Sequence, residues 1–259
     1  LGTLEIRPLD GANPLSTFAS SRTYAIDSNT VGDNANCQLV RCTLGQFIPA
    51  LGLDKFISNV GFDAKNKISL QQLSNSLDAT GFRTNLGFVE GSGFPATMRL
   101  TLRNGANAIL NQVQRTIPAY GHEQTSLSAV FGNLALSDGR VEVEVISAGG
   151  KVSSYASVVD NRTKDPLLVF PVQGEKVSAQ HYVVPGVAEL NNGPSSNFHT
   201  DMRLFNASST AVPVTLSYFP GFGGARPADL HITLNPGEVK AFDNVLPSLW
   251  QLTATGGAG

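Results

Sequence analysis

The side chains best suited to acid–base or metal chemistry are spread thinly along this sequence. Its histidines are His122, His181, His199 and His231. None stands in a His-x-His, His-x3-His or His-Glu-x-x-His arrangement, the spacings that bring two imidazoles to one metal ion. His199 and Asp201 would share one face of a strand, but an ordinary polar strand surface explains that pair. The histidines therefore predict neither a catalytic centre nor a metal centre.

Nucleophiles and ligand-binding loops give no stronger signal. Gly91-Ser-Gly93 is typical of a loop, and the sequence has no Gly-x-Ser-x-Gly elbow. Gly221-Phe-Gly-Gly224 precedes neither Lys-Ser nor Lys-Thr, so it predicts a flexible hairpin tip and not a phosphate loop. Asp33, Asn34 and Asn36 could offer oxygen ligands to calcium, but turn-forming Asx residues explain the same cluster. The sequence predicts no enzyme and no cofactor.

The cysteines Cys37 and Cys42 lie close together in a polar loop. No other Cys or His stands nearby, so they lack the ligands of a zinc site. We expect a small disulfide that closes this loop, which would place the protein in an oxidising compartment. Two free thiols are the alternative.

Composition restricts the partners and the location of the protein. Of the 259 residues 41% are hydrophobic, only 15% are charged, and the formal net charge is −2. Such a chain folds, but it has no basic patch for nucleic acid and no acidic tail. Apolar stretches such as Leu167–Val172 are too short to span a bilayer. The polar, weakly charged surface favours an extracellular or cell-surface location.

Alternation of apolar and polar residues is the dominant pattern of the chain. It is clearest in Thr97–Arg103 and Arg140–Ile146, and Gly149-Gly150 predicts a hairpin between the second of these strands and a further strand at Lys151–Val159. Other strands are expected at residues 68–73, 82–90, 106–117 and 123–127. Short helical turns are expected at residues 53–60, 128–133 and 245–250. Together these elements predict an antiparallel β-sandwich.

The same design occurs more than once along the chain. Phe82-Arg-Thr-Asn-Leu recurs as Phe198-His-Thr-Asp-Met, and the segment from Gly139 to Tyr155 recurs near the start, from Gly2 to Tyr24. A unit of about 120 residues suits one β-sandwich and is too long for a solenoid repeat. The order of the matches predicts three regions. These are a C-terminal half-repeat with the Cys loop (residues 1–48), a complete sandwich (49–172) and the N-terminal half of a second sandwich (173–259).

A resemblance to a known family supports this organisation. Phe82–Phe88, Ile117-Pro118, Gly139–Val143 and Tyr155–Asn161 resemble the tandem immunoglobulin-like repeats of large secreted bacterial surface proteins. The resemblance implies an all-β protein with two antiparallel immunoglobulin-like β-sandwich domains in an extracellular, multi-domain setting. It carries no catalytic residues.

The two half-repeats need partner strands, because unpaired edges and an apolar face drive association. The expected N-terminal hairpin, Thr3–Leu9 with Phe18–Ile26, would complete the second sandwich. It could close its own chain, complete a neighbouring copy, or belong to a fragment of a longer array. We expect a filament subunit that joins copies head to tail by donor-strand complementation. The expected assembly residues are Leu4, Ile6, Tyr24, Ile26 and Trp250.

The alternative function is an adhesion or carbohydrate-binding module of a larger surface protein. Aromatic side chains can stack on sugar rings, and Tyr218, Phe222 and Trp250 are the candidates. Asn161-Arg-Thr163 and Asn206-Ala-Ser208 have the glycosylation pattern Asn-x-Ser/Thr. The expected partners are therefore further copies of the protein and, in the alternative, surface glycans.

Overall fold

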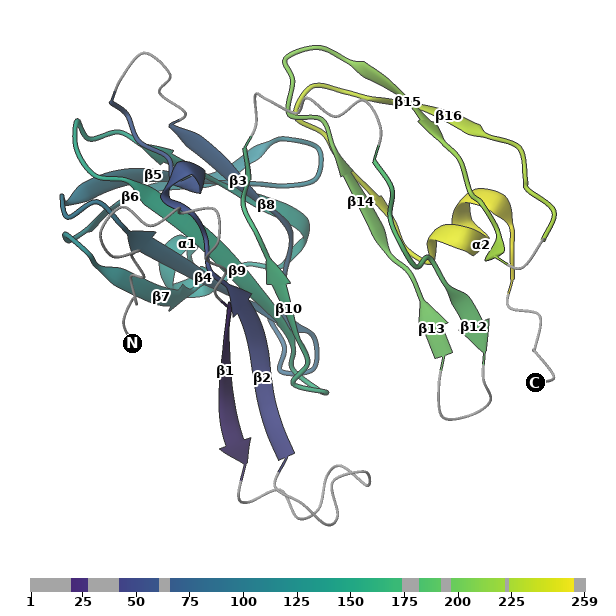
Figure 1. Ribbon diagram of the computed structural model, residues 1–259, viewed down its shortest axis with the longest axis horizontal. Coiled ribbons are helices and arrows are strands. Elements are labelled where there is room, and N and C mark those ends of the chain that lie inside the picture. Colours follow the sequence, from purple (N-terminus) through teal and green to yellow (C-terminus); the bar gives the residue numbers. More distant parts are fainter. Residues whose placement is uncertain are drawn as a thin grey trace, which may run out of the picture. The chain divides into compact units, whose positions relative to one another are not determined.

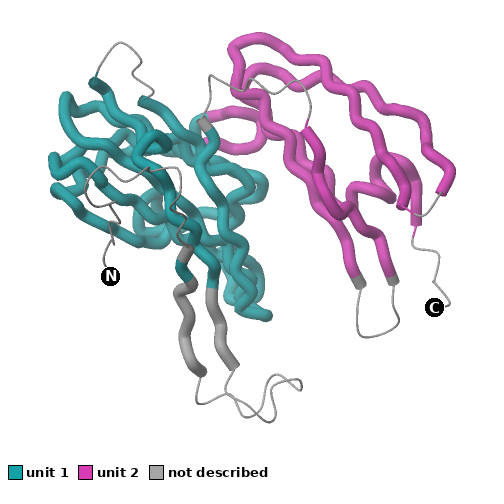
Figure 2. The backbone as a smooth tube through the Cα atoms, viewed as in Figure 1, with its two compact units in different colours: residues 1–102, 109–172 teal, residues 103–108, 173–259 magenta. Residues whose placement is uncertain are grey.

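The computed structural model describes residues 20–27, 42–60, 66–173, 182–191, 197–221 and 224–253. The chain divides into two compact units (Figure 2). Unit 1 consists of residues 1–102 and 109–172, and unit 2 consists of residues 103–108 and 173–259. Strands dominate both units, with several antiparallel sheets, so the all-β prediction is confirmed and the arrangement is consistent with a β-sandwich.

Unit 1 has two main sheets (Figure 1). The four-stranded sheet has the order β10-β9-β4-β7, and the five-stranded sheet has the order β11-β3-β8-β5-β6. The strands of the first sheet are β4 (Phe82–Glu90), β7 (His122–Ser126), β9 (Val152–Asp160) and β10 (Pro166–Val169). Those of the second are β3 (Lys67–Asn75), β5 (Ala96–Arg103), β6 (Ile109–Ile117), β8 (Leu136–Val145) and β11 (Val172–Gln173). Two short helical elements, η2 (Leu53–Lys55) and α1 (Leu127–Phe131), lie near predicted helical turns.

A single hydrophobic core joins these two sheets. It includes Leu86 and Phe88 of β4 from one sheet and Leu100 of β5 and Val143 of β8 from the other, all fully buried. These residues belong to strands whose apolar and polar positions alternate, so one face of each strand turns inward. The hairpin predicted between β8 and β9 is wrong, because β8 lies in the five-stranded sheet and β9 in the four-stranded sheet. The segment between them crosses from one sheet to the other. Its Gly150 has φ +83, and a Cβ there would lie 2.5 Å from the Cβ of Ala96.

The described residues of unit 2 form three two-stranded antiparallel sheets and one short helix. The pairs are β12 (Glu189–Asn191) with β13 (Asn197–His199), β14 (Met202–Phe205) with β17 (Val239–Phe242), and β15 (Val212–Leu216) with β16 (Leu230–Leu234). The helix α2 (Val245–Trp250) follows β17 at the predicted helical turn.

Unit 2 repeats the strand pairing found in the first part of unit 1. In unit 1, β4 pairs with β7, β5 is adjacent to β6, and α1 follows β7. In unit 2, β14 pairs with β17, β15 pairs with β16, and α2 follows β17. Leu86 lies opposite Thr125 in the first case, and Met202 lies opposite Phe242 in the second. The equivalence agrees with the sequence match between Phe82–Leu86 and Phe198–Met202.

The N-terminal strand pairs with the strand that follows it in the chain. The predicted strand Phe18–Ile26 corresponds to β1 (Ser20–Asp27), which pairs antiparallel with β2 (Cys42–Pro49) in a two-stranded sheet. The expected partner, Thr3–Leu9, lies outside the described residues. The pairing of β1 with the next strand along the chain matches that of β9 with β10.

Candidate assembly site

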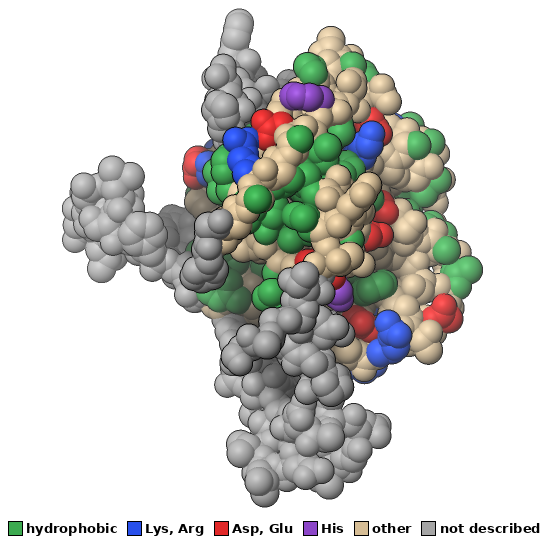
Figure 3. Space-filling model, turned by 90° about the vertical axis from the view of Figure 1, so that its right-hand side faces the viewer, with side chains coloured by type: hydrophobic (Ala, Val, Ile, Leu, Met, Phe, Trp, Pro, Cys, Tyr) green, Lys and Arg blue, Asp and Glu red, His purple; other side chains and the backbone are tan. Residues whose placement is uncertain are grey.

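One face of the β15–β16 ribbon in unit 2 is apolar along its whole length. Its cross-strand pairs are Val212 with Leu234, Val214 with Ile232, and Leu216 with Leu230. Residues opposite each other on paired strands share a face, so these six side chains form one surface, which we name the apolar face. Only Leu234 is buried, and the other five are partly exposed. In Figure 3 hydrophobic side chains gather at the centre of the visible side of unit 2, with polar residues around them.

The alternate positions of the same ribbon are polar or exposed. Thr215 and His231 lie opposite each other, and the Thr215 hydroxyl is 3.0 Å from Nδ1 of His231. Pro213 and Thr233 form the other exposed pair. The ribbon therefore has one face suited to water and one suited to a second layer of protein.

The strands of the β15–β16 ribbon have fewer paired neighbours than their counterparts in unit 1. Among the described residues β15 and β16 pair only with each other, so the other edge of each has no described ladder. In unit 1, β4 lies between β7 and β9, and β5 lies between β6 and β8. The described residues of unit 2 include no counterpart of β8, β9 or β10.

Trp250, the expected assembly residue, ends helix α2 and contacts Tyr218. The two ring centroids are 5.7 Å apart with the planes tilted by 37°, and Trp250 Nε1 donates a hydrogen bond to the Ala228 carbonyl at 3.1 Å. Next to Tyr218, Phe219 is 70% exposed, and the Arg226 guanidinium lies 4.4 Å from its ring centroid. The structure thus brings together two of the three residues proposed to bind carbohydrate.

Other expected residues fall outside what the structure describes. Leu4, Ile6, Cys37 and Phe222 are not among the described residues. Tyr24 and Ile26 lie in β1 and Cys42 lies in β2, and the structure describes the backbone of these residues. The assembly role of the N-terminal residues and the Cys37–Cys42 disulfide therefore remain predictions.

The buried carboxylate of Glu90, which the sequence analysis did not identify, accepts hydrogen bonds from the loops at one end of unit 1. Glu90 has no exposed surface and accepts five hydrogen bonds of 2.5–3.0 Å. The donors are the backbone N–H and hydroxyl of Ser92 and the backbone N–H groups of Gly93, Tyr120 and Lys151. Burial alone would raise the pKa of Glu90, but the hydrogen bonds, led by that from the Ser92 side chain, lower it to about 2. Glu90 thus joins three separate loops.

Asn206 occupies the equivalent position in unit 2 and uses different chemistry. It is buried, and its Nδ2 donates to the carbonyls of Thr210, Leu234 and Asn235. Its Oδ1 accepts from the backbone N–H and hydroxyl of Ser208, just as Glu90 accepts from Ser92. The predicted glycosylation pattern at this position therefore marks a structural asparagine, because its amide is buried and fully hydrogen-bonded.

The aromatic pair His122 and Tyr155 lies across β4 in unit 1. Their rings are stacked, His122 Nε2 is 3.1 Å from the Tyr155 hydroxyl, and a Cβ at Gly87 would lie 2.1 Å from the Tyr155 ring. Burial lowers the pKa of His122 and raises that of Tyr155. Both groups are thus held neutral, as expected for packing across strands.

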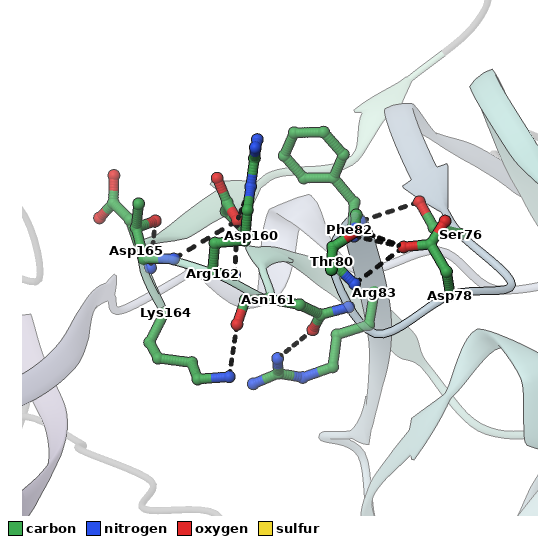
Figure 4. Close-up of polar contacts among 12 residues, drawn as sticks. Ser76, Asp78, Thr80, Phe82, Arg83, Asp160, Asn161, Arg162, Lys164 and Asp165 are labelled. Carbon is green, nitrogen blue, oxygen red and sulfur yellow. Dashed lines mark hydrogen bonds and ion pairs between the residues drawn. The ribbon is translucent and has the colours of Figure 1, made fainter. Parts of the chain in front are cut away.

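The opposite end of unit 1 is closed by local turns (Figure 4). Oδ1 of Asp78 accepts from the Thr80 hydroxyl and from the backbone N–H groups of Thr80 and Gly81, and these bonds lower its pKa. Asp160 accepts from the backbone N–H of Arg162, which lowers its pKa in the same way. Asp78 is exposed and Asp160 is partly exposed, and the partners of both are near in sequence, so they explain turn geometry without a ligand.

His199 and Asp201, the pair considered from the sequence, have different hydrogen-bond partners. His199 Nδ1 lies 2.9 Å from a Glu189 carboxylate oxygen, while Asp201 accepts from the backbone N–H of Asn244. Among the described residues, no group of three or more His, Cys, Asp or Glu side chains could hold a metal ion. In the same residues no helix is long and apolar enough to cross a membrane.

In comparisons with known proteins, no protein-family model, no curated protein and no solved structure matches this chain.

Proposed function

We propose that this protein is an extracellular structural protein built from immunoglobulin-like β-sandwich repeats, and that strands of a neighbouring copy complete its second sandwich. The observation that carries the proposal is the partly exposed apolar face of the β15–β16 ribbon, whose two strands pair only with each other among the described residues. In unit 1 the equivalent strands β4 and β5 contribute fully buried side chains to the core, with β9 beside β4 and β8 beside β5. Unit 2 shows the same pairing without those strands among its described residues.

The physical basis is the addition of strands to a sheet edge. Backbone hydrogen bonds define the position of the added strand, and apolar side chains supply most of the free energy. The donor segment lies near the N-terminus and the acceptor lies in unit 2, so the two surfaces differ. Such a heterologous contact joins copies head to tail and extends as a filament unless its rotation closes a ring.

Electron microscopy and size-exclusion chromatography of the full chain test this proposal. We expect filaments or ladders of oligomers in dilute buffer, whereas uniform particles near 27.3 kDa would contradict it. A sharper test is Ile232→Asp, which puts a charge on the apolar face, with Thr233→Asp as the matched control on the exposed face. The first variant should abolish assembly and the second should leave it intact.

Deleting residues 1–27 separates the possible sources of the donor. If a neighbouring copy donates, the shortened chain loses assembly, and unshortened chains added in trans bind to it. If the hairpin closes its own chain, the full protein is a monomer and the deletion mainly lowers its stability. The single tryptophan, Trp250, reports the state of unit 2 by fluorescence in both cases.

The proposed extracellular location is tested through the cysteines. A Cys37–Cys42 disulfide makes the native protein lighter by the mass of two hydrogens and resistant to alkylation until it is reduced. Rapid alkylation of both thiols in freshly isolated protein would contradict the disulfide.

An adhesion or carbohydrate-binding role is the second candidate function. The Tyr218–Trp250 contact and the exposed Phe219 support it, because aromatic faces of this kind can stack on sugar rings. A glycan array tests this role with Phe219→Ala, which leaves the Tyr218–Trp250 contact in place. Binding that disappears in this variant would support adhesion, and an empty array would count against it.

A further inference from the structure

The end of unit 1 that holds the buried carboxylate also carries exposed apolar side chains. Phe94 is 64% exposed, Tyr120 is 56% exposed and Leu53 is 47% exposed. All three lie at the loop between β4 and β5. Phe94 belongs to this loop, a Cβ at Gly91 would lie 2.9 Å from Cδ2 of Leu53, and a Cβ at Gly93 would lie 2.7 Å from the Tyr120 hydroxyl oxygen. We name these three side chains the exposed tip.

Tyr120 is held in a backbone conformation that favours glycine. Its φ is +53, in the left-handed region, where a large side chain is strained. Its N–H donates to the Glu90 carboxylate at 2.9 Å, while Gly121 donates to the Pro118 carbonyl and accepts from the N–H of Glu90, each at 2.9 Å. The ring adds little to the core, because more than half of its surface is exposed. Strain at an exposed aromatic residue is typical of a position that binds a ligand.

The loops around the exposed tip carry no net formal charge. These loops are residues 51–56, 90–95, 118–121 and 147–151, and their charged residues are Asp54, Lys55, Glu90 and Lys151. Asp54 and Lys55 pair with each other at 3.2 Å. Glu90 is buried and accepts from backbone N–H groups, including that of Lys151. Because the charges balance, these loops favour an uncharged ligand over an anion or a cation.

Small residues lie next to the two aromatic rings of the exposed tip. Gly93 precedes Phe94, Ala119 precedes Tyr120, and a Cβ at Gly149 would lie 3.8 Å from that of Phe94. Such neighbours leave the rings accessible and add little apolar area of their own. A stable protein interface buries about 800 Å² on each partner, whereas a sugar ring needs only one aromatic face for its apolar C–H side. The size of the exposed tip therefore suits an uncharged saccharide better than a protein.

We propose that the exposed tip of unit 1 binds an uncharged saccharide, with the rings of Phe94 and Tyr120 against its apolar faces. The Tyr120 hydroxyl can exchange hydrogen bonds with sugar hydroxyls. Glu90 is a positioning residue, because it holds the backbone N–H of Tyr120 and that of Gly93, the residue before Phe94. The site is separate from the aromatic residues of unit 2, and it does not depend on strand complementation.

Isothermal titration calorimetry of the full chain tests the site, with neutral hexasaccharides of glucose, xylose, mannose and N-acetylglucosamine as probes. We expect at least one of them to bind. Tyr120→Gly removes the ring and relieves the backbone strain, so this variant should fold normally and lose about tenfold in affinity. Phe94→Ala should lose a similar factor. The control is Phe82→Ala, which removes an exposed ring at the opposite end of unit 1 (Figure 4) and should leave the affinity unchanged.

Three results would overturn this site. The first is that none of the sugars binds. The second is sugar binding that Phe219→Ala abolishes and Tyr120→Gly does not, which would place recognition in unit 2. The third is self-association that Tyr120→Gly weakens in the absence of sugar binding, which would assign the exposed tip to a contact with a second copy. None of these results decides whether strand complementation occurs, because Tyr120 and Phe94 lie outside the apolar face.

Discussion

The two units of this protein use the same strand pairing but differ in how much of it they bury. In unit 1 the core draws fully buried side chains from both sheets, including Phe88 of β4 and Val143 of β8. Among the described residues of unit 2, the buried apolar side chains are Leu234, Val239, Val245 and Leu246. Strands can therefore pair without a complete core. In unit 1 the strands β8 and β9 flank β5 and β4 and add buried side chains to the core. Substitutions at equivalent positions measure this difference.

The largest expected effect is in the core of unit 1. Phe88→Ala should lower the free energy of unfolding by about 3–5 kcal/mol, because Phe88 is fully buried. The equivalent Leu204→Ala in unit 2 should cost about 1 kcal/mol, because Leu204 is partly exposed. Urea unfolding measures both, with circular dichroism for the whole chain and Trp250 fluorescence for unit 2. Equal costs at the two positions would contradict the proposed difference in packing.

The next effect concerns the loop anchor Glu90. Its pKa is lowered from 4.5 to about 2 in the folded protein, so its contribution to stability is complete above pH 4.5 and is lost as the pH falls toward 2. The shift corresponds to about 3 kcal/mol. Glu90→Gln should lose that amount at pH 7 and have a flatter pH dependence between pH 4.5 and 2. Urea midpoints at pH 7, 4 and 3 measure this, and a parallel pH profile in the variant would contradict it.

The equivalent anchor in unit 2 should respond to pH in the opposite direction. Asn206→Asp replaces an amide that donates to three carbonyls with an acceptor, at an expected cost of about 2–3 kcal/mol at pH 7. Those carbonyls and burial favour the protonated acid, so its pKa in the folded state should be raised. The lost stability should then return in part as the pH falls. Trp250 fluorescence during urea unfolding at pH 7 and 4 measures this change.

The smallest effect tests the close contact between Tyr155 and β4. Gly87→Ala would place a Cβ 2.1 Å from the Tyr155 ring and should cost about 1–3 kcal/mol as the ring moves. Gly149→Ala is the matched control, because its nearest neighbour would be 3.8 Å away. Thermal unfolding should show a lower midpoint for the first variant and little change for the second. A similar loss in both variants would indicate that the contact contributes nothing specific.

The sequence predicted the strands with clear alternation and missed features that depend on distant parts of the chain. Thr97–Arg103 was predicted because its alternation is a local pattern. The hairpin at Gly149-Gly150 was wrong, because local turn chemistry does not decide that β8 and β9 join different sheets. The pairing of β1 with β2 was missed, because no strand was predicted at Cys42–Pro49. Helix α2 was expected from a short segment, but nothing local predicted its contact with Tyr218.

The functional site shows the same limit. Trp250 could be singled out from the sequence as a large aromatic residue. The apolar face could be recognised only from the register of β15 with β16, which the sequence does not show. In the sequence Glu90 does not differ from other charged residues at strand ends. The pattern that could have identified it is the serine two residues later, Ser92, which recurs as Ser208 after Asn206. A polar residue followed by Ser at this spacing, in both repeats, could have indicated a shared loop anchor.

The Glu90 anchor also affects how freely this end of unit 1 can change during evolution. Four of its five hydrogen bonds come from backbone N–H groups, and only Ser92 contributes a side chain. Replacing the side chains of Tyr120 or Lys151 therefore leaves the corresponding bonds in place. The loop tips can vary in size, charge and shape while one carboxylate preserves their backbone geometry. A surface with that property can acquire new contacts without a new fold.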